Sequence, residues 1–138
     1  MDKISLIMPA YDIAWRTIAR AIDSILDQDY TNWELIVVKN GVIDEGKIAK
    51  AVEPYLTDER IKLLQFDQGG ACFARNRGAE VATGDIYSFF SSDFVMKAGG
   101  LRIWAERFRD NPDIDFVYGG YGWTNPDVQV YRSQEFDQ

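Results

Sequence analysis

Short apolar runs alternate with segments of helical periodicity along the chain, and this alternation restricts the possible folds more than any other feature. Four runs, which begin at Ile4, Glu34, Ile61 and Ile86, have the length and composition of buried strands. Between them, apolar residues recur every three or four positions, as on the buried face of an amphipathic helix. Strands that alternate with helices through short connections form a mostly parallel sheet with helices on both faces. The sequence therefore predicts an α/β fold in one doubly wound domain, residues 1–138.

The boundaries of the predicted elements follow from the apolar periodicity and from the turn residues between the elements. Strands are expected at residues 4–8, 34–38, 61–66, 86–90 and 116–118, with a short additional strand at 128–131. Helices are expected at residues 15–26, 44–56, 69–82 and 99–108, and Asp44 is expected to cap the second of them.

Charge and composition exclude several classes of protein. The formal net charge is −7 and the sequence pI is about 4.5, which argues against a nucleic-acid partner because such binding needs a basic surface. The chain has no histidine, so His-based catalytic triads and metal sites are excluded. Its single cysteine, Cys72, cannot form an intramolecular disulfide. The sequence contains no signal peptide and no membrane-spanning segment, and we expect a cytoplasmic location.

Polar and aromatic residues follow the predicted strands, at the edge of the sheet where parallel α/β proteins bind ligands. After the first strand, the loop that begins at Pro9 carries Tyr11, whose ring can face a base and whose hydroxyl can face a sugar or phosphate. The alternative is a rim tyrosine packed on the following helix. After the second strand, the Asn40 amide matches the edge of a pyrimidine, or else forms a left-handed turn with Gly41.

Two later loops carry groups suited to a diphosphate and to a cation. Gly70 opens a predicted helix and lets an anion approach the positive helix end, although loop flexibility also explains a glycine there. Arg75 and Arg77 are two positions apart in that helix, so at most one of them faces the crevice. Ser92 and Asp93 follow the fourth strand, where the Asp93 carboxylate is a candidate ligand for a metal or a phosphate-linked cation.

Taken together, these segments resemble the family 2 glycosyltransferases, which have the GT-A fold, a Rossmann-like α/β architecture. The resemblance runs in order through residues 3–120. It is carried by Pro9-Ala-Tyr11, Asp23-Ser-Ile-Leu-Asp-Gln28, Trp33-Glu-Leu-Ile-Val-Val38, Ala74-Arg-Asn-Arg-Gly78, Ala82-Thr-Gly-Asp85 and Ser92-Asp93. Each piece is short, but the set in this order and spacing is specific.

The resemblance implies a domain that binds a nucleoside-diphosphate sugar and transfers the sugar to an acceptor, which is a glycan, a lipid-linked sugar or a protein. Asp93 would hold a Mn²⁺ or Mg²⁺ ion that bridges the two phosphates and stabilises charge on the leaving diphosphate. In such enzymes the acceptor hydroxyl attacks the anomeric carbon directly, with inversion, and an Asp or Glu acts as base. The residues expected to bind the nucleotide sugar are Pro9, Tyr11, Asn40, Gly70, Arg75, Ser92 and Asp93, with Tyr11 and Asn40 beside the base.

Three features depart from the family pattern. Ser91 stands where the acidic motif usually has its first Asp, so we expect the metal to bind weakly. The base-recognition loop reads Lys39-Asn40-Gly41-Val42 in place of the usual Asp-Asp-Gly-Ser, which leaves the identity of the base open. The sequence stops at Gln138, before the segment that usually binds the acceptor and supplies the catalytic base, so no residue is assigned as the base.

These departures keep two alternatives to a glycosyltransferase open. One is a non-catalytic nucleotide-sugar-binding module, an inactive remnant of such an enzyme. The other is a structural or oligomerising domain that keeps only the fold. Trp104, Tyr121 and Trp123 are expected to be exposed, and exposed aromatic residues would suit self-association into a homo-oligomer.

Overall fold

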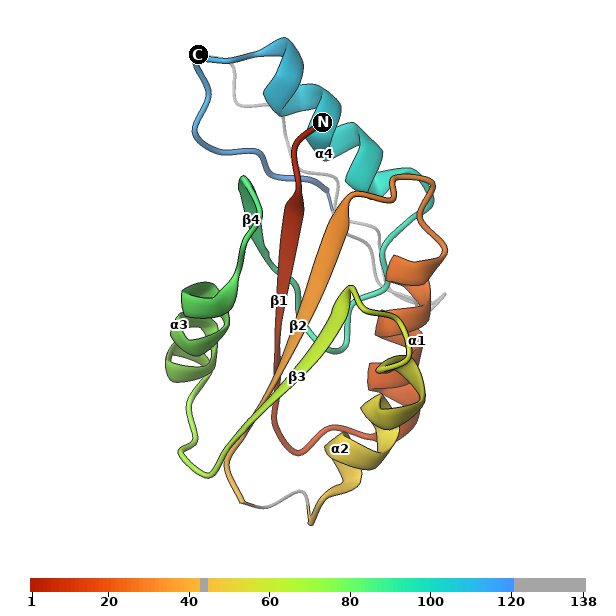
Figure 1. The fold of residues 1–138 in the computed structure, drawn as a ribbon, viewed down its shortest axis with the longest axis vertical. Helices are drawn as coiled ribbons and strands as arrows, with labels where there is room; N and C mark the ends of the chain where they lie inside the picture. The colour runs from red at the N-terminus through yellow and green to blue at the C-terminus, as the bar shows by residue number, and fades with distance from the viewer. Residues whose placement is uncertain (43–44, 121–138) are drawn as a thin grey trace. The chain divides into compact units, whose positions relative to one another are not determined.

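The structure is a computed structural model, and it describes residues 1–42 and 45–120 (Figure 1). By internal contacts the chain divides into two compact units, Met1–Ala105 and Glu106–Gln138. The elements in chain order are β1 (Ile4–Ala10), α1 (Trp15–Leu26), β2 (Trp33–Asn40), α2 (Lys47–Val52), η1 (Glu53–Tyr55), β3 (Ile61–Phe66), α3 (Ala71–Val81), β4 (Ile86–Phe89) and α4 (Gly100–Asp110). These are the first four predicted strands and the four predicted helices, with ends that differ by a few residues.

The strands form one parallel sheet in the order β3-β2-β1-β4. Ala10 of β1 pairs with Lys39 of β2, and Asn40, the last residue of β2, pairs with the last residue of β3. The pairing of β1 with β4 ends earlier along β1, where Ile7 lies opposite Phe89. The carboxyl ends of β1, β2 and β3 therefore lie at one edge of the sheet, and the loop after β4 approaches the same edge.

Helices cover both faces of the sheet because the central strands are apolar on both sides. Figure 1 shows α1 and α2 on one face and α3 on the other. The larger cluster of buried residues joins β1 and β2 to α1 and α2, with Leu35 and Ile22 among its fully buried members. The smaller cluster joins Ile7 and Val38 of the sheet to Ala74 of α3. This arrangement confirms the predicted α/β fold class.

The predicted helix at residues 44–56 is divided at Pro54. The α-helical part ends at Val52, and Glu53–Tyr55 form a 3₁₀ turn. Proline has no backbone N–H, and its ring clashes with the preceding turn, so regular α-helical hydrogen bonding does not continue through it. Asp44, the expected helix cap, lies outside the described residues.

The predicted strand at residues 116–118 is wrong. Phe116 and Tyr118 belong to the described part of the chain but form no strand there, and they are 76% and 53% exposed. A short apolar run is a local signal, whereas a strand also needs a neighbouring strand for its backbone hydrogen bonds. The two rings instead stack on each other, with centroids 6.1 Å apart. The additional strand predicted at 128–131 lies outside the described residues.

Two further predictions concern the exposed aromatic residues, which would suit self-association, and the absence of a membrane-spanning segment. Trp104 is not freely exposed, because it shares a helix face with the buried Leu101 and packs against the larger core cluster. Tyr121 and Trp123 lie outside the described residues, and self-association stays a prediction. No helix in the described part of the chain is both long enough and apolar enough to cross a membrane.

Candidate functional site

A pocket of about 550 Å³ lies at the carboxyl ends of the strands, and its volume is in the usual range of small-ligand sites. It occupies the sheet edge where the sequence predicts a ligand crevice. Six of the seven predicted nucleotide-sugar-binding residues line it, namely Pro9, Tyr11, Asn40, Gly70, Arg75 and Ser92. The other described lining residues are Gly69, Ala71, Phe89, Phe90, Ser91 and Phe94.

Tyr11 lines the pocket and packs on Gly41. The tyrosine is 49% exposed, so much of its surface is free to contact a ligand. Gly41 has a φ of +84°, and a Cβ atom at this position would lie 2.6 Å from Cε2 of the tyrosine ring. Both the backbone conformation and the ring therefore require glycine at position 41. The left-handed residue of the Asn-Gly pair is this glycine and not Asn40, which corrects the turn alternative.

Asn40 is the last residue of β2 and is only 3% exposed. Its Nδ2 donates a hydrogen bond to the carbonyl oxygen of Ala10 at 3.2 Å. Its Oδ1 accepts a hydrogen bond from the backbone N–H of Gly70 at 3.0 Å. The amide thus joins the ends of β1 and β2 to the start of α3. Its contact with a pyrimidine edge stays a prediction.

Arg75 lines the pocket and Arg77 does not, as their spacing predicts. The guanidinium of Arg75 lies 5.8 Å from the centroid of the Phe89 ring. That of Arg77 pairs with Glu80 at 2.5 Å. Among the described lining residues only Arg75 carries a charge, and it forms no ion pair within residues 1–42 and 45–120. A guanidinium without a carboxylate partner in a pocket is suited to bind a phosphate group.

The N-terminus of α3 lies beside Arg75 at the pocket. Gly70 is the N-cap residue, with a φ of +119°, and as a glycine it has no side chain with which to cap the helix. Gly70 and Ala71 both line the pocket. The first N–H groups of a helix have no partners within the helix and attract anions. The helix end and the guanidinium therefore present positive potential to the same space.

The segment after β4 forms a turn that separates Ser92 from Asp93. The Phe94 N–H donates to the Ser91 carbonyl oxygen at 3.0 Å, which closes the turn. Ser92 is buried and lines the pocket, whereas Asp93 is exposed and is not a lining residue. Ser91 Oγ donates to Oδ1 of Asp93 at 2.5 Å. In the described ranges, no three acidic or cysteine residues lie close enough together to hold a metal ion by themselves.

Sequence reasoning missed three aromatic residues of the pocket, Phe89, Phe90 and Phe94. Phe89 and Phe94 are 55% and 54% exposed, whereas Phe90 is buried in the larger core cluster. Phe89 pairs with Ile7, whose side chain packs on the α3 face of the sheet. Because paired residues of adjacent strands project to the same face of a sheet, Phe89 points to that face as well. The alternation along β4 was the signal that could have placed Phe89 beside Arg75.

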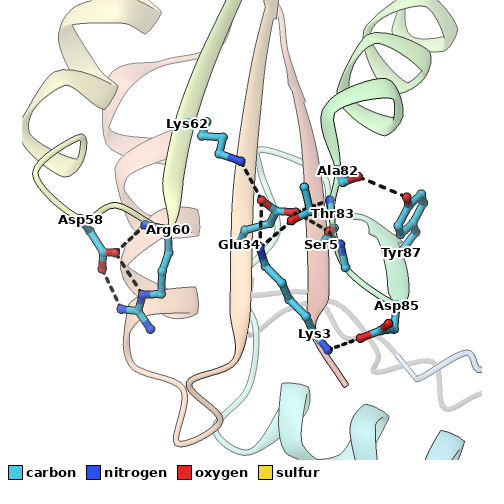
Figure 2. Close-up of polar contacts among 11 residues, drawn as sticks. Lys3, Ser5, Glu34, Asp58, Arg60, Lys62, Ala82, Thr83, Asp85 and Tyr87 are labelled. Atoms are coloured by element: carbon cyan, nitrogen blue, oxygen red, sulfur yellow. Dashed lines mark hydrogen bonds and ion pairs between the residues drawn. The ribbon is translucent and has the colours of Figure 1, made fainter. Parts of the chain in front are cut away.

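A second polar cluster surrounds Glu34 at the amino ends of the strands, the end opposite the pocket (Figure 2). Its carboxylate accepts hydrogen bonds from Ser5 Oγ at 2.7 Å, from Thr83 N–H at 2.6 Å and from Thr83 Oγ1 at 2.9 Å. Two lysines also contact the Glu34 carboxylate: Nζ of Lys62 lies 2.9 Å from its Oε2 atom, and Nζ of Lys3 lies 3.4 Å from the same atom. Burial alone would raise the pKa of Glu34, but the hydrogen bonds outweigh it and lower this pKa from 4.5 to about 2. The cluster joins strands and loops, and we assign it to stability.

Comparison with known proteins identifies the family. The model for Glycosyl transferase family 2 matches residues 5–137. The chain belongs to this family. It is 38% identical over 123 residues to the Escherichia coli UDP-Glc:alpha-D-GlcNAc-diphosphoundecaprenol beta-1,3-glucosyltransferase WfgD, a match that covers 88% of this chain and 47% of WfgD. It is 32% identical over 122 residues to the Streptococcus pneumoniae glycosyltransferase GlyG, covering 87% of this chain and 39% of GlyG.

This family 2 chain thus spans less than half the length of these two relatives. Solved structures show the same fold. The structure of S. aureus TarS 1–349 in complex with UDP-GlcNAc matches with a TM-score of 0.72 and 25% identity, over 80% of this chain and 32% of TarS 1–349. The Pyrobaculum calidifontis mannosyltransferase PcManGT in complex with GDP-Man and Mn²⁺ matches with a TM-score of 0.63 and 27% identity, over 70% of this chain and 29% of PcManGT. The predicted GT-A fold is confirmed.

Proposed function

We propose that the chain is the donor-binding part of a glycosyltransferase and that its pocket binds a nucleoside-diphosphate sugar. The observation that carries the proposal is the convergence of six predicted site residues, from four separate segments of the chain, on one pocket. Membership of the family supports it, as do the UDP-GlcNAc and GDP-Man named in the related structures. Isothermal titration with UDP, GDP and dTDP sugars tests the proposal. Binding to none of them at millimolar concentration would refute it.

In this proposal the Tyr11 ring stacks on the base. The ring is half exposed, and it packs against Gly41. Stacking on an aromatic ring is available to every base, because each base has a π face. Tyr11 therefore contributes affinity without selecting one base.

Arg75 and the N-terminus of α3 are proposed to bind the diphosphate. Replacing Arg75 by glutamine is expected to lower the affinity for UDP about 10- to 100-fold, since hydrogen bonds to charged groups contribute about 1.5–3 kcal/mol. The affinity for uridine, which has no phosphate, should change little. Titration calorimetry on both ligands measures the difference.

Arg77→Gln is the matched control, because Arg77 belongs to the same helix but pairs with Glu80 and does not line the pocket. We expect UDP to bind this variant as it binds the unaltered chain. An equal loss in both variants, or an equal loss of uridine and UDP affinity in Arg75→Gln, would contradict the assignment.

In this proposal Asp93, an exposed carboxylate next to Ser92 of the pocket lining, shares a divalent cation with the bound ligand. A carboxylate oxygen is a preferred ligand for Mg²⁺, which proteins commonly hold with one or two carboxylates together with substrate phosphates. One oxygen of Asp93 already accepts a hydrogen bond from Ser91. We therefore propose that Asp93 holds Mn²⁺ or Mg²⁺ only when a diphosphate is bound. Such an ion would stabilise negative charge on the leaving diphosphate.

Metal binding should accordingly depend on the nucleotide. Titrating Mn²⁺ into the protein, with electron paramagnetic resonance as the readout, is expected to show weak binding alone and clearly tighter binding with UDP. Asp93→Ala should remove the difference, and Ser91→Asp should tighten Mn²⁺ binding by adding a second carboxylate. Asp113→Ala, which removes an exposed carboxylate outside the pocket lining, is the control. Unchanged Mn²⁺ binding in Asp93→Ala would exclude Asp93 as a ligand.

The proposed reaction is a direct transfer with inversion. The acceptor oxygen forms a bond to the anomeric carbon while the bond from that carbon to the diphosphate breaks, and a carboxylate takes the acceptor proton. No residue of the described chain is assigned as this base. The acceptor named for WfgD is a lipid-linked sugar, so this class is the first to test.

A non-catalytic nucleotide-sugar-binding module is the second candidate. It is favoured by the single carboxylate at the acidic motif, whose Oδ1 is engaged by Ser91. Release of UDP from a UDP-sugar separates the two candidates. Slow release that Asp93→Ala abolishes supports the enzyme, and tight binding without release supports the module. The cytoplasmic location stays a prediction in either case.

A further inference from the structure

The walls of the pocket come from segments far apart in the sequence, and one buried side chain joins three of them. Asn40 contacts the carbonyl oxygen of Ala10 at the end of β1 and the N–H of Gly70 at the start of α3. It is itself the end of β2. We propose that Asn40 is a positioning residue that holds these three walls at a fixed separation, and does not read the base. The inference rests on the proposed nucleotide site.

The orientation of the Asn40 amide is fixed by the chemistry of its neighbours. Ala10 offers only a carbonyl acceptor and Gly70 only an N–H donor at these contacts. Rotating the amide by 180° would place oxygen against oxygen and N–H against N–H, and both contacts would become repulsive. With 3% of the residue exposed, the amide has little surface left for a ligand.

The contact with Gly70 determines where the start of α3 points. Gly70 has no side chain and a φ of +119°, so its own conformation does little to fix the loop. A second hydrogen bond, from the Gly41 N–H to the Gln68 carbonyl oxygen at 3.1 Å, ties the same loop to the end of β2. Asn40 and its neighbour Gly41 thus hold the loop at two positions, Gly70 and Gln68. The groups proposed to meet the diphosphate follow directly, in Ala71 and Arg75.

A positioning role and a base-reading role predict different losses of nucleotide affinity when Asn40 is replaced. If Asn40 recognised the base, its replacement would weaken the binding of nucleotides that carry one base and leave the binding of the others unchanged. If it fixes the walls, its replacement weakens every nucleotide by the same factor, because displacement of the helix end affects the diphosphate that all of them share. The loss of one hydrogen bond that fixes these groups corresponds to a change of about tenfold in affinity.

The experiment compares Asn40→Ala and Asn40→Asp with Asn76→Ala, an exposed asparagine of α3 outside the pocket lining. Dissociation constants are measured for UDP, CDP and GDP, and hydrogen exchange of the Gly70 amide is measured by NMR without ligand. In Asn40→Ala we expect about tenfold faster Gly70 exchange and an equal, about tenfold loss for the three nucleotides. Asn40→Asp keeps an acceptor for Gly70, so Gly70 stays protected. Its carboxylate repels the Ala10 oxygen and displaces the end of β1, which is another wall of the pocket, so all three nucleotides are expected to bind equally more weakly.

Two results would overturn the inference. One is unchanged Gly70 exchange in Asn40→Ala, and the other is a loss confined to one base in either variant. If Asn40→Ala does not fold, the equal loss expected for Asn40→Asp decides the question. If the unaltered chain binds none of the nucleotides, the proposed function fails, and Gly70 exchange alone still decides whether Asn40 holds the loop.

Discussion

Replacing Glu34 by alanine is expected to lower the free energy of unfolding by about 2–4 kcal/mol, the order of cost when two hydrogen-bond donors lose a buried carboxylate acceptor. The carboxylate is 2% exposed and accepts hydrogen bonds from Ser5, Thr83 and Lys62. Without this carboxylate, the buried hydroxyl of Ser5 and the backbone N–H of Thr83 lose their hydrogen-bond acceptor. Urea unfolding measures the change. Glu59→Ala removes the same charge from an exposed residue and should stay within about 0.5 kcal/mol of the unaltered chain.

The same residue predicts how stability depends on pH. The pKa of Glu34 is lowered to about 2 in the folded chain, from 4.5, so the unfolded chain binds the proton more tightly. The resulting stabilisation is complete above pH 4.5 and is lost as the pH falls toward 2. Each pKa unit corresponds to about 1.4 kcal/mol, so the total is about 3 kcal/mol. Glu34→Gln should lack this acid-dependent loss between these pH values, and an identical pH profile would contradict the assignment.

Replacing Gly78 by valine is expected to destabilise the fold by about 2–3 kcal/mol through overpacking. Gly78 is buried where α3 packs against the sheet. A Cβ atom there would lie 2.4 Å from Cγ2 of Ile7 and 3.3 Å from Cγ2 of Val38. Both residues are fully buried, and their branched side chains have few alternative rotamers. Helix propensity favours valine over glycine by a few tenths of a kcal/mol, so it cannot account for a loss.

The consequence of Gly78→Val extends to the pocket, because the helix that must shift also carries Arg75. We expect the affinity for UDP to fall together with the thermal midpoint. Gly119→Val is the control, since no atom of the described residues lies within 4 Å of a Cβ atom placed at Gly119. A valine at position 78 that left both the midpoint and the UDP affinity unchanged would show that the close approach of α3 to the sheet is not required.

Local patterns in the sequence account for most of the fold. The helices and the first four strands follow from apolar periodicity, which acts over a few residues and needs no knowledge of distant partners. The strand predicted at 116–118 failed for the same reason. Its three residues carry the local signal of a strand, but in the described structure no neighbouring strand supplies hydrogen bonds to them.

The sequence by itself determined the parallel α/β architecture and the loops that form the pocket. In a parallel sheet the carboxyl ends of the strands lie at one edge, whatever contacts the individual side chains make. The tertiary structure alone decided what each polar group does. It buried the Asn40 amide between two backbone groups, placed the Arg75 guanidinium at the pocket, and surrounded Glu34 with donors 28–49 positions away in the chain. Such contacts depend on long-range packing, and periodicity carries no information about them.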